Sequence, residues 1–274
     1  MCGIIGIVGS KLSSLEVHKV HESLGLMKHR GPDDEGYLFA NLSKGLLEAR
    51  SGSDSLPEIR RKQPSVFIDL KFEPEVLLGH RRLSILDLTA KGHQPMCDAE
   101  RKVWIIHNGE IYNYIELRKE LQNIGYSFAT KTDTEVVLKA YKEWGIDAVK
   151  KFNGMWAFAI LDMNNKTIVL SRDRFGVKPL YYFISDTCFA FSSEIKSLIV
   201  LPSVTKTLNA GVIYEFLAFN LKDNGEDCFF ANIKQVLPAH NALYDFASRR
   251  LSSKKYWHLD YNNFQKMPEA VVEE

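Results

Sequence analysis

The second residue of the chain is a cysteine, which lies between Met1 and Gly3. A small second residue permits removal of the initiator methionine, and Cys2 would then carry a free α-amine. A thiol is mostly protonated at neutral pH, whereas an α-amino group with a pKa of about 8 is partly neutral and can accept the thiol proton. Cys2 therefore has the chemistry of a nucleophile that needs no catalytic histidine. Alone the signal is weak, because a free cysteine is more often a small buried hydrophobic residue.

Six short motifs are distributed along the chain. They are HRGPDD at His29–Asp34, HRRLSI at His80–Ile85, NGEIYN at Asn108–Asn113, TDTE at Thr132–Glu135, GMWAFA at Gly154–Ala159 and RDRFGVKPL at Arg172–Leu180. Together with Cys2, and in this order, they resemble the glutaminase domain of the asparagine synthetase (glutamine-hydrolysing) family. The resemblance runs from Cys2 to about Tyr256, and motifs that match together are far more specific than any one of them.

This resemblance implies both a fold and a reaction. The fold is α+β, the four-layer αββα sandwich of two mainly antiparallel sheets found in N-terminal nucleophile hydrolases. In the reaction, Cys2 attacks the side-chain amide of glutamine and releases ammonia, and water hydrolyses the thioester to glutamate. In the family, a second domain with a Ser-Gly-Gly-x-Asp-Ser loop activates aspartate with ATP and magnesium. No such run occurs here, so we expect no metal or cofactor in this chain and no asparagine synthesis by it alone.

The resemblance also implies which residues bind the two charges of glutamine. Arg82 would hold the α-carboxylate, because a guanidinium can bind a carboxylate through two parallel hydrogen bonds. Asp133 would bind the α-ammonium group, and Glu110 would share it. Each residue has a plainer interpretation. Arg82 could be a surface arginine, Asp133 an acid favoured by a helix dipole, and Glu110 an exposed acid near a helix start.

Asn108 and Gly109 are the predicted donors to the oxyanion that develops on the amide oxygen. Asn108 offers a side-chain N–H and Gly109 a backbone N–H, from what we interpret as one bend of the chain. Asn-Gly is also the strongest hairpin-turn pair. A helix pattern rather than a returning strand follows Gly109, however, so a simple hairpin fits poorly.

The histidines are expected to have supporting roles. His18 and His21 lie three residues apart on an expected helix, but a third ligand is missing, so we predict a solvated helix face and no metal site. His29, His80 and His107 lie within or beside the motifs, and we interpret them as packing or supporting residues.

Strand-like segments dominate the sequence and are rich in β-branched or aromatic residues. They are expected at Ile4–Val8, Val76–Leu78, Val103–His107, Trp156–Leu161, Thr167–Ser171, Leu180–Ile184 and Cys188–Ser192. Short polar links at 162–166 and 185–187 predict hairpins and therefore antiparallel sheets.

Three helices are expected between these strands, at about Leu15–Met27, at Tyr114–Ile124 and from Thr132 to Trp144. Asn113 is the expected N-cap of the second helix. Thr132 and Glu135 form a capping-box pattern for the third helix, which Gly145 should end.

We predict three parts along the chain: a glutamine amidotransferase domain at 2–220, a strand-rich connection at 221–266 and the start of a helix at 267–274. Pro268 followed by Glu269 gives the helix-start signal. We expect the chain to be the front part of a longer polypeptide, with a frayed tail as the alternative. Between Gly36 and His80 it carries more residues than the family normally does. The polar stretch Ser51–Gln63 should be a surface loop that serves as a lid, a partner surface or neutral decoration.

Composition excludes several classes of protein. A net charge of +1 without a basic stripe argues against nucleic acid as a partner. No apolar run is long enough to span a membrane, and the start lacks the basic region of a secretion signal. The cysteines show no C-x-x-C pair and no zinc spacing.

We therefore expect a cytoplasmic enzyme. Its partners should be glutamine and an ammonia-accepting synthetase domain, in cis or as a separate subunit, with a homodimer as a further option. The charged residues of Arg172–Lys178 either form internal ion pairs or face that partner.

Two other functions remain open from the sequence. One is an amidotransferase with another acceptor, such as a sugar or a phosphoribosyl compound, although NGEIYN and RDRFGVKPLY favour the asparagine synthetase branch. The other is a glutamine-binding module without turnover. The presence of the main predicted site residues argues against that option; these residues are Cys2, Arg82, Asn108, Gly109 and Asp133.

Overall fold

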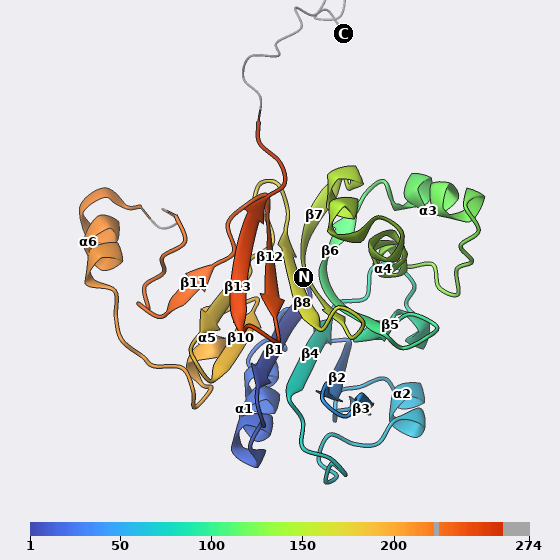
Figure 1. Ribbon diagram of the computed structural model, residues 1–274, viewed down its shortest axis with the longest axis horizontal. Coiled ribbons are helices and arrows are strands. Elements are labelled where there is room, and N and C mark those ends of the chain that lie inside the picture. The colour runs from blue at the N-terminus through green and yellow to red at the C-terminus, as the bar shows by residue number, and fades with distance from the viewer. Residues whose placement is uncertain (222–224, 260–274) are drawn as a thin grey trace, which may run out of the picture.

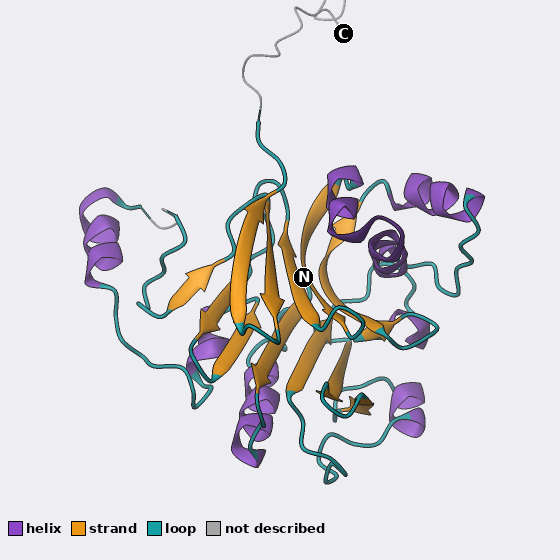
Figure 2. Ribbon diagram, viewed as in Figure 1, coloured by secondary structure: helices purple, strands orange, loops and turns teal. Residues whose placement is uncertain are grey.

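The architecture consists of two antiparallel sheets that face each other and are covered by helices, in a computed structural model that describes residues 1–221 and 225–259 (Figures 1 and 2). The predicted helix start at 267–274 lies outside the described residues. Within the described residues, no helix is both long enough and apolar enough to cross a bilayer.

The first sheet, sheet A, contains the strand that follows Cys2. Its order is β11-β9-β10-β1-β4-β2-β3. The strands are β1 (Gly3–Gly9), β2 (Asp34–Asn41), β3 (Leu46–Ser51), β4 (Val76–Arg82), β9 (Tyr181–Ile184), β10 (Cys188–Ser192) and β11 (Ile233–Gln235). All of these pairings are antiparallel, and the register of β1 on β4 places Gly3 opposite Arg81.

The second sheet, sheet B, has the order β13-β12-β8-β7-β6-β5. Its strands are β5 (Met96–Cys97), β6 (Val103–Ile111), β7 (Gly154–Asp162), β8 (Thr167–Arg172), β12 (His240–Asp245) and β13 (Arg250–Lys255). The predicted hairpins are present, because β7 pairs with β8 and β9 with β10. Three strands from the region of the predicted connection, β11, β12 and β13, extend the two sheets.

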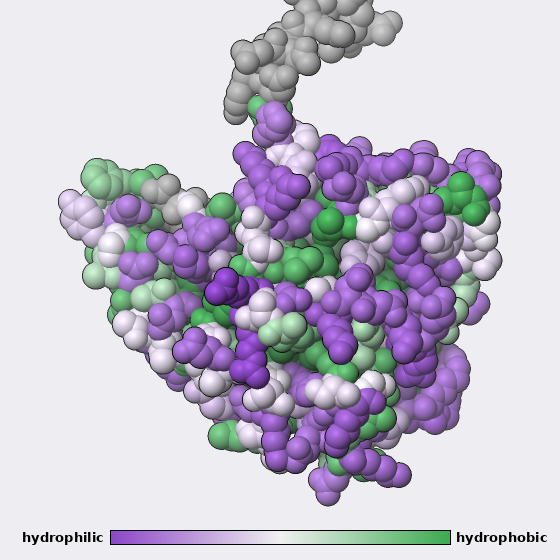
Figure 3. Space-filling view, viewed as in Figure 1, coloured by the Kyte–Doolittle hydropathy of each residue, from purple (hydrophilic) through white to green (hydrophobic). Residues whose placement is uncertain are grey.

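Helices cover the outer face of each sheet. Helices α1 (Ser14–Gly25) and α5 (Ile195–Ile199) pack on sheet A, and α3 (Tyr114–Asn123) and α4 (Asp133–Trp144) lie on the side of sheet B. The remaining helices are α2 (Pro57–Lys62), α6 (Ala210–Phe219) and the 3₁₀ helices η1 (Ala90–Gly92) and η2 (Gly145–Lys151). Alpha6 projects from the body with an apolar surface, on which Tyr214 and Leu217 are exposed (Figures 1 and 3).

The main core lies between the two sheets. Side chains alternate across a strand, so β1 and β4 direct Ile4 and Leu78 towards Ile106 and Ala159 of sheet B. Two further apolar clusters lie between each sheet and its own helices. Two sheets face to face between two helical layers form the predicted αββα sandwich, and this prediction is confirmed.

The structure corrects several local predictions. Beta4 continues through Arg82 instead of ending at Leu78, and β6 continues through Gly109 to Ile111. The stretch Ser51–Gln63 contains helix α2 rather than only a loop. Asn113 does not cap α3 through its side chain, because its amide bonds the backbone of Lys151 and Asn153 instead.

Beta2 and β3 were also missed by the sequence patterns. Beta2 begins with the acids Asp34 and Glu35, yet every residue in it is buried. Its first two residues are satisfied by polar groups far along the chain: Asp34 accepts a hydrogen bond from Leu56 N, and Glu35 pairs with Arg81. Buried charges require such partners.

Candidate active site

Cys2 lies at the start of β1, at the edge where β4 ends. The register of the two strands places Cys2 at the position opposite Arg82, one step beyond the pairing of Gly3 with Arg81. The Cys2 Sγ accepts a hydrogen bond from Leu83 N at 3.4 Å and lies 3.8 Å from Leu83 O. Arg30 Nε donates to Cys2 O at 2.9 Å. The predicted nucleophile is therefore held by the strand that carries Arg82 and by the HRGPDD motif.

A cavity of about 220 Å³ opens beside this thiol. Five of the predicted site residues line it; they are Cys2, Arg82, Gly109, Glu110 and Asp133. These residues come from the beginning of sheet A, the end of β4, the end of β6 and the first turn of α4. The fold thus brings together residues that are up to 131 positions apart.

Arg82 contributes a guanidinium to the wall of this cavity. Its side chain is buried, with 4% of the residue exposed, and no described carboxylate pairs with it. The guanidinium donates to the backbone oxygens of Thr89, at 2.9 Å, Leu86 and Asp87. Gly92 leaves space beside it, because a Cβ there would lie 2.0 Å from Arg82 Nη2. A buried guanidinium held by neutral carbonyls is suited to an anionic ligand.

Asp133 faces the same cavity from the N-terminus of α4. Its carboxylate accepts Ile111 N at 3.0 Å and Thr134 N at 2.8 Å, so it is fixed in place. The helix begins as predicted, since the Thr132 side chain accepts the Glu135 N–H. The reciprocal half of the capping box is absent, because the Glu135 carboxylate accepts the Ala129 and Thr130 backbone N–H groups. Glu110 is half-buried at the cavity wall.

Asn108 and Gly109 lie in a strand, so the bend that we expected at this pair is wrong. Asn108 is fully buried behind the cavity wall. Neither amide atom of its side chain has a hydrogen-bond partner within the described parts of the chain. Such a buried polar group without a partner is uncommon in folded proteins and is expected where a ligand or reaction intermediate supplies the bond. Gly109 is required by crowding, because a Cβ would lie 2.3 Å from Met155 O.

The RDRFGVKPL loop contributes a residue whose position the sequence left undecided. Asp173 is buried, and its carboxylate accepts the backbone N–H groups of Trp156, Phe175, Val177 and Lys178. This arrangement directs Lys178 to the cavity wall, with 5% of the residue exposed. Burial lowers the pKa of Lys178, although Glu110 and the Cys2 thiolate oppose that shift. A lysine could not be assigned to this site from sequence, because the loop motif fits a structural role equally well.

Burial also acts on the two titratable groups at the beginning of the chain. Desolvation raises the pKa of the Cys2 thiol and lowers the pKa of the Met1 α-amine. The thiol is therefore a poor nucleophile until a base removes its proton, whereas an α-amine in this environment is more readily neutral. Within the described residues, no group of three or more His, Cys, Asp or Glu side chains is arranged to hold a metal.

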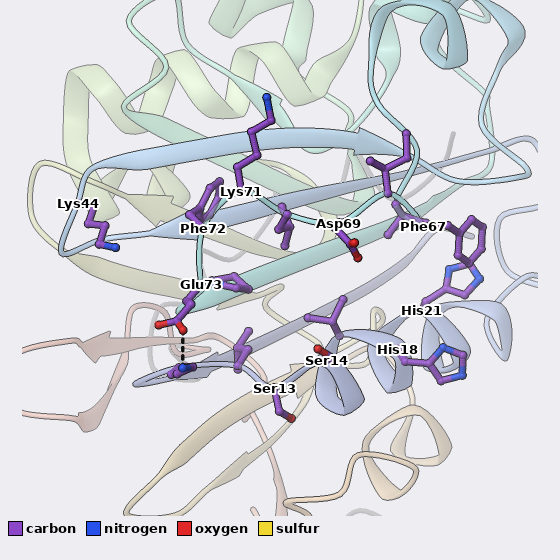
Figure 4. Close-up of a pocket in the computed structure, with 17 residues that line it drawn as sticks. Ser13, Ser14, His18, His21, Lys44, Phe67, Asp69, Lys71, Phe72 and Glu73 are labelled. Carbon is purple, nitrogen blue, oxygen red and sulfur yellow. Dashed lines mark ion pairs between the residues drawn. The ribbon is translucent and has the colours of Figure 1, made fainter.

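A second and larger cavity, of about 760 Å³, lies away from Cys2, between the start of α1 and the segment 66–74. Figure 4 shows His18 and His21 on its wall, together with Phe67 and the ion pair of Glu73 with Lys11. His21 Nδ1 lies 2.7 Å from the Tyr37 hydroxyl. None of the predicted site residues lines this cavity.

The comparison with known families concerns the chain as a whole. A model of the glutamine amidotransferase domain matches residues 65–257. The chain belongs to this family.

Two curated proteins show significant similarity to this chain. Putative asparagine synthetase (glutamine-hydrolyzing) 2 of Methanocaldococcus jannaschii is 35% identical over 295 residues, which cover 100% of this chain and 50% of that protein. Asparagine synthetase (glutamine-hydrolyzing) 3 of Bacillus subtilis is 33% identical over 224 residues, which cover 81% of this chain and 36% of that protein. The chain thus spans half or less of the length of these curated relatives.

A solved structure supports the fold. Glutamine phosphoribosylpyrophosphate amidotransferase from B. subtilis superposes with a TM-score of 0.68 at 19% identity, over 93% of this chain and 49% of that chain. At this identity the likeness concerns the fold alone.

Proposed function

We propose that this chain hydrolyses glutamine to glutamate and ammonia through a thioester on Cys2. The observation that carries the proposal is the shared cavity, in which the Cys2 thiol lies with a guanidinium that has no ion-pair partner among the described residues and with a fixed carboxylate. A free amino acid with opposite charges at its α-carbon fits this pair of groups. Arg82 would bind the α-carboxylate, and Asp133 with Glu110 would bind the α-ammonium group.

The proposed reaction has two steps. After loss of Met1, the α-amine of Cys2 removes the thiol proton, and the sulfur attacks the amide carbon of glutamine. The C–N bond then breaks, and the transferred proton leaves with ammonia. In the second step, water attacks the thioester carbon, which releases glutamate and restores the thiol. Asn108 and Gly109 would donate hydrogen bonds to the oxygen that becomes negative in each step.

We also propose that the ammonia serves asparagine synthesis. Support comes from the two curated relatives named above, which carry the name asparagine synthetase (glutamine-hydrolyzing) and of which this chain covers 50% and 36%. In this proposal, an ammonia-accepting synthetase domain uses ATP and magnesium to activate aspartate, in cis or as a separate subunit. Supplying aspartate, ATP, magnesium and glutamine to a preparation that contains both parts should yield asparagine, and transfer to another acceptor would contradict this finer assignment.

Cys2→Ala tests the hydrolysis. This change keeps a small side chain, so folding should change little, but no thioester can form. Glutaminase activity should vanish while glutamine binding survives. A glutamine analogue with an electrophilic carbon in place of the amide should alkylate Cys2 in the unmodified protein. The other three cysteines serve as internal controls, because Cys97, Cys188 and Cys228 do not line the cavity. Label on one of these cysteines, or full activity of Cys2→Ala, would refute the proposal.

A further inference from the structure

His107 lies immediately before Asn108 on β6 and is one of the residues that line the cavity beside Cys2. The residue is only 2% exposed. Its Nε2 atom is buried and has no hydrogen-bond partner in the described part of the chain. An unpartnered polar atom at the wall of a binding cavity is expected where a ligand supplies the partner. The packing role expected from the sequence does not account for this atom.

The hydrogen bonds around the ring determine which nitrogen carries the proton. Gln94 Oε1 accepts the His107 backbone N–H at 2.6 Å, so the Gln94 amide nitrogen is oriented as a donor to Thr134 Oγ1, at 3.3 Å. Within the described residues, the Thr134 hydroxyl contacts only Gln94 and His107 Nδ1, the latter at 3.2 Å. The hydroxyl accepts from Gln94, and its own hydrogen therefore has His107 Nδ1 as its acceptor.

This arrangement makes His107 a fixed donor. When Nδ1 accepts a hydrogen bond, the neutral ring carries its proton on Nε2, the buried atom next to the cavity residue Gly109. Burial lowers the pKa of His107, which favours the neutral ring. Gly109 keeps the space next to this atom open, because a Cβ there would lie 2.8 Å from His107 Nε2.

The neighbours of the ring, Gln94 and Thr134, line the same cavity as Arg82 and Asp133, which we propose to bind the charged groups at the α-carbon of the substrate. Thr134 directly follows Asp133 on α4, and Gln94 lies two residues after Gly92, which borders the Arg82 guanidinium. The ring nitrogen is a donor, so it suits the carboxylate of the amino acid and not its ammonium group. A carboxylate has enough lone pairs to accept from both a guanidinium and an imidazole.

We propose that His107 binds the α-carboxylate of glutamine through Nε2–H, beside Arg82, and that Gln94 and Thr134 hold the ring in the required tautomer. This inference rests on the proposed glutaminase function. It makes His107 a specificity-determining residue for substrates with a free α-carboxylate, in addition to the residues that the family resemblance implied.

Steady-state kinetics of His107→Phe test the contact. Phenylalanine retains a flat ring but has no donor, so KM for glutamine should rise about tenfold or more while kcat changes by less than about twofold. His107→Gln places an N–H near the position of Nε2 and should recover part of the affinity. His18→Phe, an exposed histidine in the other cavity, is the matched control and should keep both constants. An unchanged KM in His107→Phe, or a loss confined to kcat, would overturn the carboxylate contact.

A second measurement determines the tautomer of His107 in the absence of substrate. The ¹⁵N chemical shifts of the His107 ring should report a neutral ring protonated on Nε2, and Thr134→Val should reduce this preference while Thr134→Ser keeps it. A ring protonated on Nδ1 would overturn the inference, even if His107→Phe failed to fold. If protein without Met1 did not hydrolyse glutamine, the proposed function would fail. The tautomer and the effect of His107→Phe on the Kd of glutamine, measured by calorimetry, would still decide the role of His107.

Discussion

Replacement of Gly92 by alanine should weaken glutamine binding while the protein stays folded. A Cβ at this position would lie 2.0 Å from Arg82 Nη2 and 2.5 Å from Arg82 Cζ. Non-bonded heavy atoms prefer a separation of roughly 3.5 Å, so the guanidinium must move by roughly 1.5 Å. Gly92 is not among the residues with a positive φ, so its backbone accepts alanine. The substitution therefore displaces a charge rather than the chain.

The expected rise in KM follows from the hydrogen bonds that the displaced Arg82 guanidinium would lose. Because the clashing atoms lie at the end of a flexible side chain, the melting temperature should fall by only a few degrees, which corresponds to about 1 kcal/mol. In contrast, a hydrogen bond to a charged group contributes about 1.5–3 kcal/mol. Since about 1.4 kcal/mol is a factor of ten, the loss of one such bond from Arg82 to the substrate should raise KM roughly 10- to 150-fold.

Glutaminase kinetics and thermal unfolding of Gly92→Ala measure these two effects separately. Gly25→Ala is the matched control, because a Cβ at the end of α1 meets no atom within 4 Å, and its KM should not change. In an Arg82→Ala background, Gly92→Ala should add little, since both changes remove one contact. A normal KM for Gly92→Ala together with a high KM for Arg82→Ala would show that the guanidinium need not occupy this position.

Three further outcomes are expected. Intact-mass measurement should show that active protein lacks Met1. Protein that retains Met1 should hydrolyse glutamine at least about 100-fold more slowly, because it lacks the amine base on Cys2. Equal activity of both forms would exclude that base. Asp133→Asn should raise KM about tenfold or more with a smaller change in kcat, since it removes the charge that faces the ammonium group; unchanged kinetics would make Asp133 structural. Asp54→Asn should lower the free energy of unfolding by about 1 kcal/mol at neutral pH. Lys28 and Arg81 lower the pKa of Asp54, so the advantage of the native aspartate is present above pH about 4 and is lost as the pH falls through the lowered pKa, as urea unfolding at several pH values would show.

Local patterns in the sequence were sufficient for much of the framework. Gly145 ends α4 with a φ of 60°, and Thr132 caps the same helix through its side chain, as the sequence predicted. The hairpins around 162–166 and 185–187 were predictable because short polar links between apolar strands determine local pairing. Five of six predicted site residues line one cavity because the motifs that carry them lie at strand or helix ends.

The misses share a physical cause, which is a partner far away in the sequence. No strand was predicted at the acids that begin β2, and only the distant Arg81 and Leu56 explain their burial. Asn108 and Gly109 suggested a bend, yet pairing with β7 keeps them in a strand. His107 was interpreted as a packing or supporting residue, because the tautomer on which its proposed role rests depends on Gln94 and Thr134.

Pairing between β1 and β4 fixes which residues of the two strands lie opposite each other. The number of residues within each strand is therefore far less tolerant of change than the number of residues in the segments that connect the strands. A shift of one residue in β4 would turn Arg82 from the inner face of sheet A to its helical face and leave Cys2 opposite another side chain. The chain from β3 to β4, by contrast, leaves the edge of sheet A and returns to the same sheet, so residues can be added there without altering that pairing. Length variation among related chains should therefore collect between Ser51 and Val76, and the seven positions of β4 should retain their number.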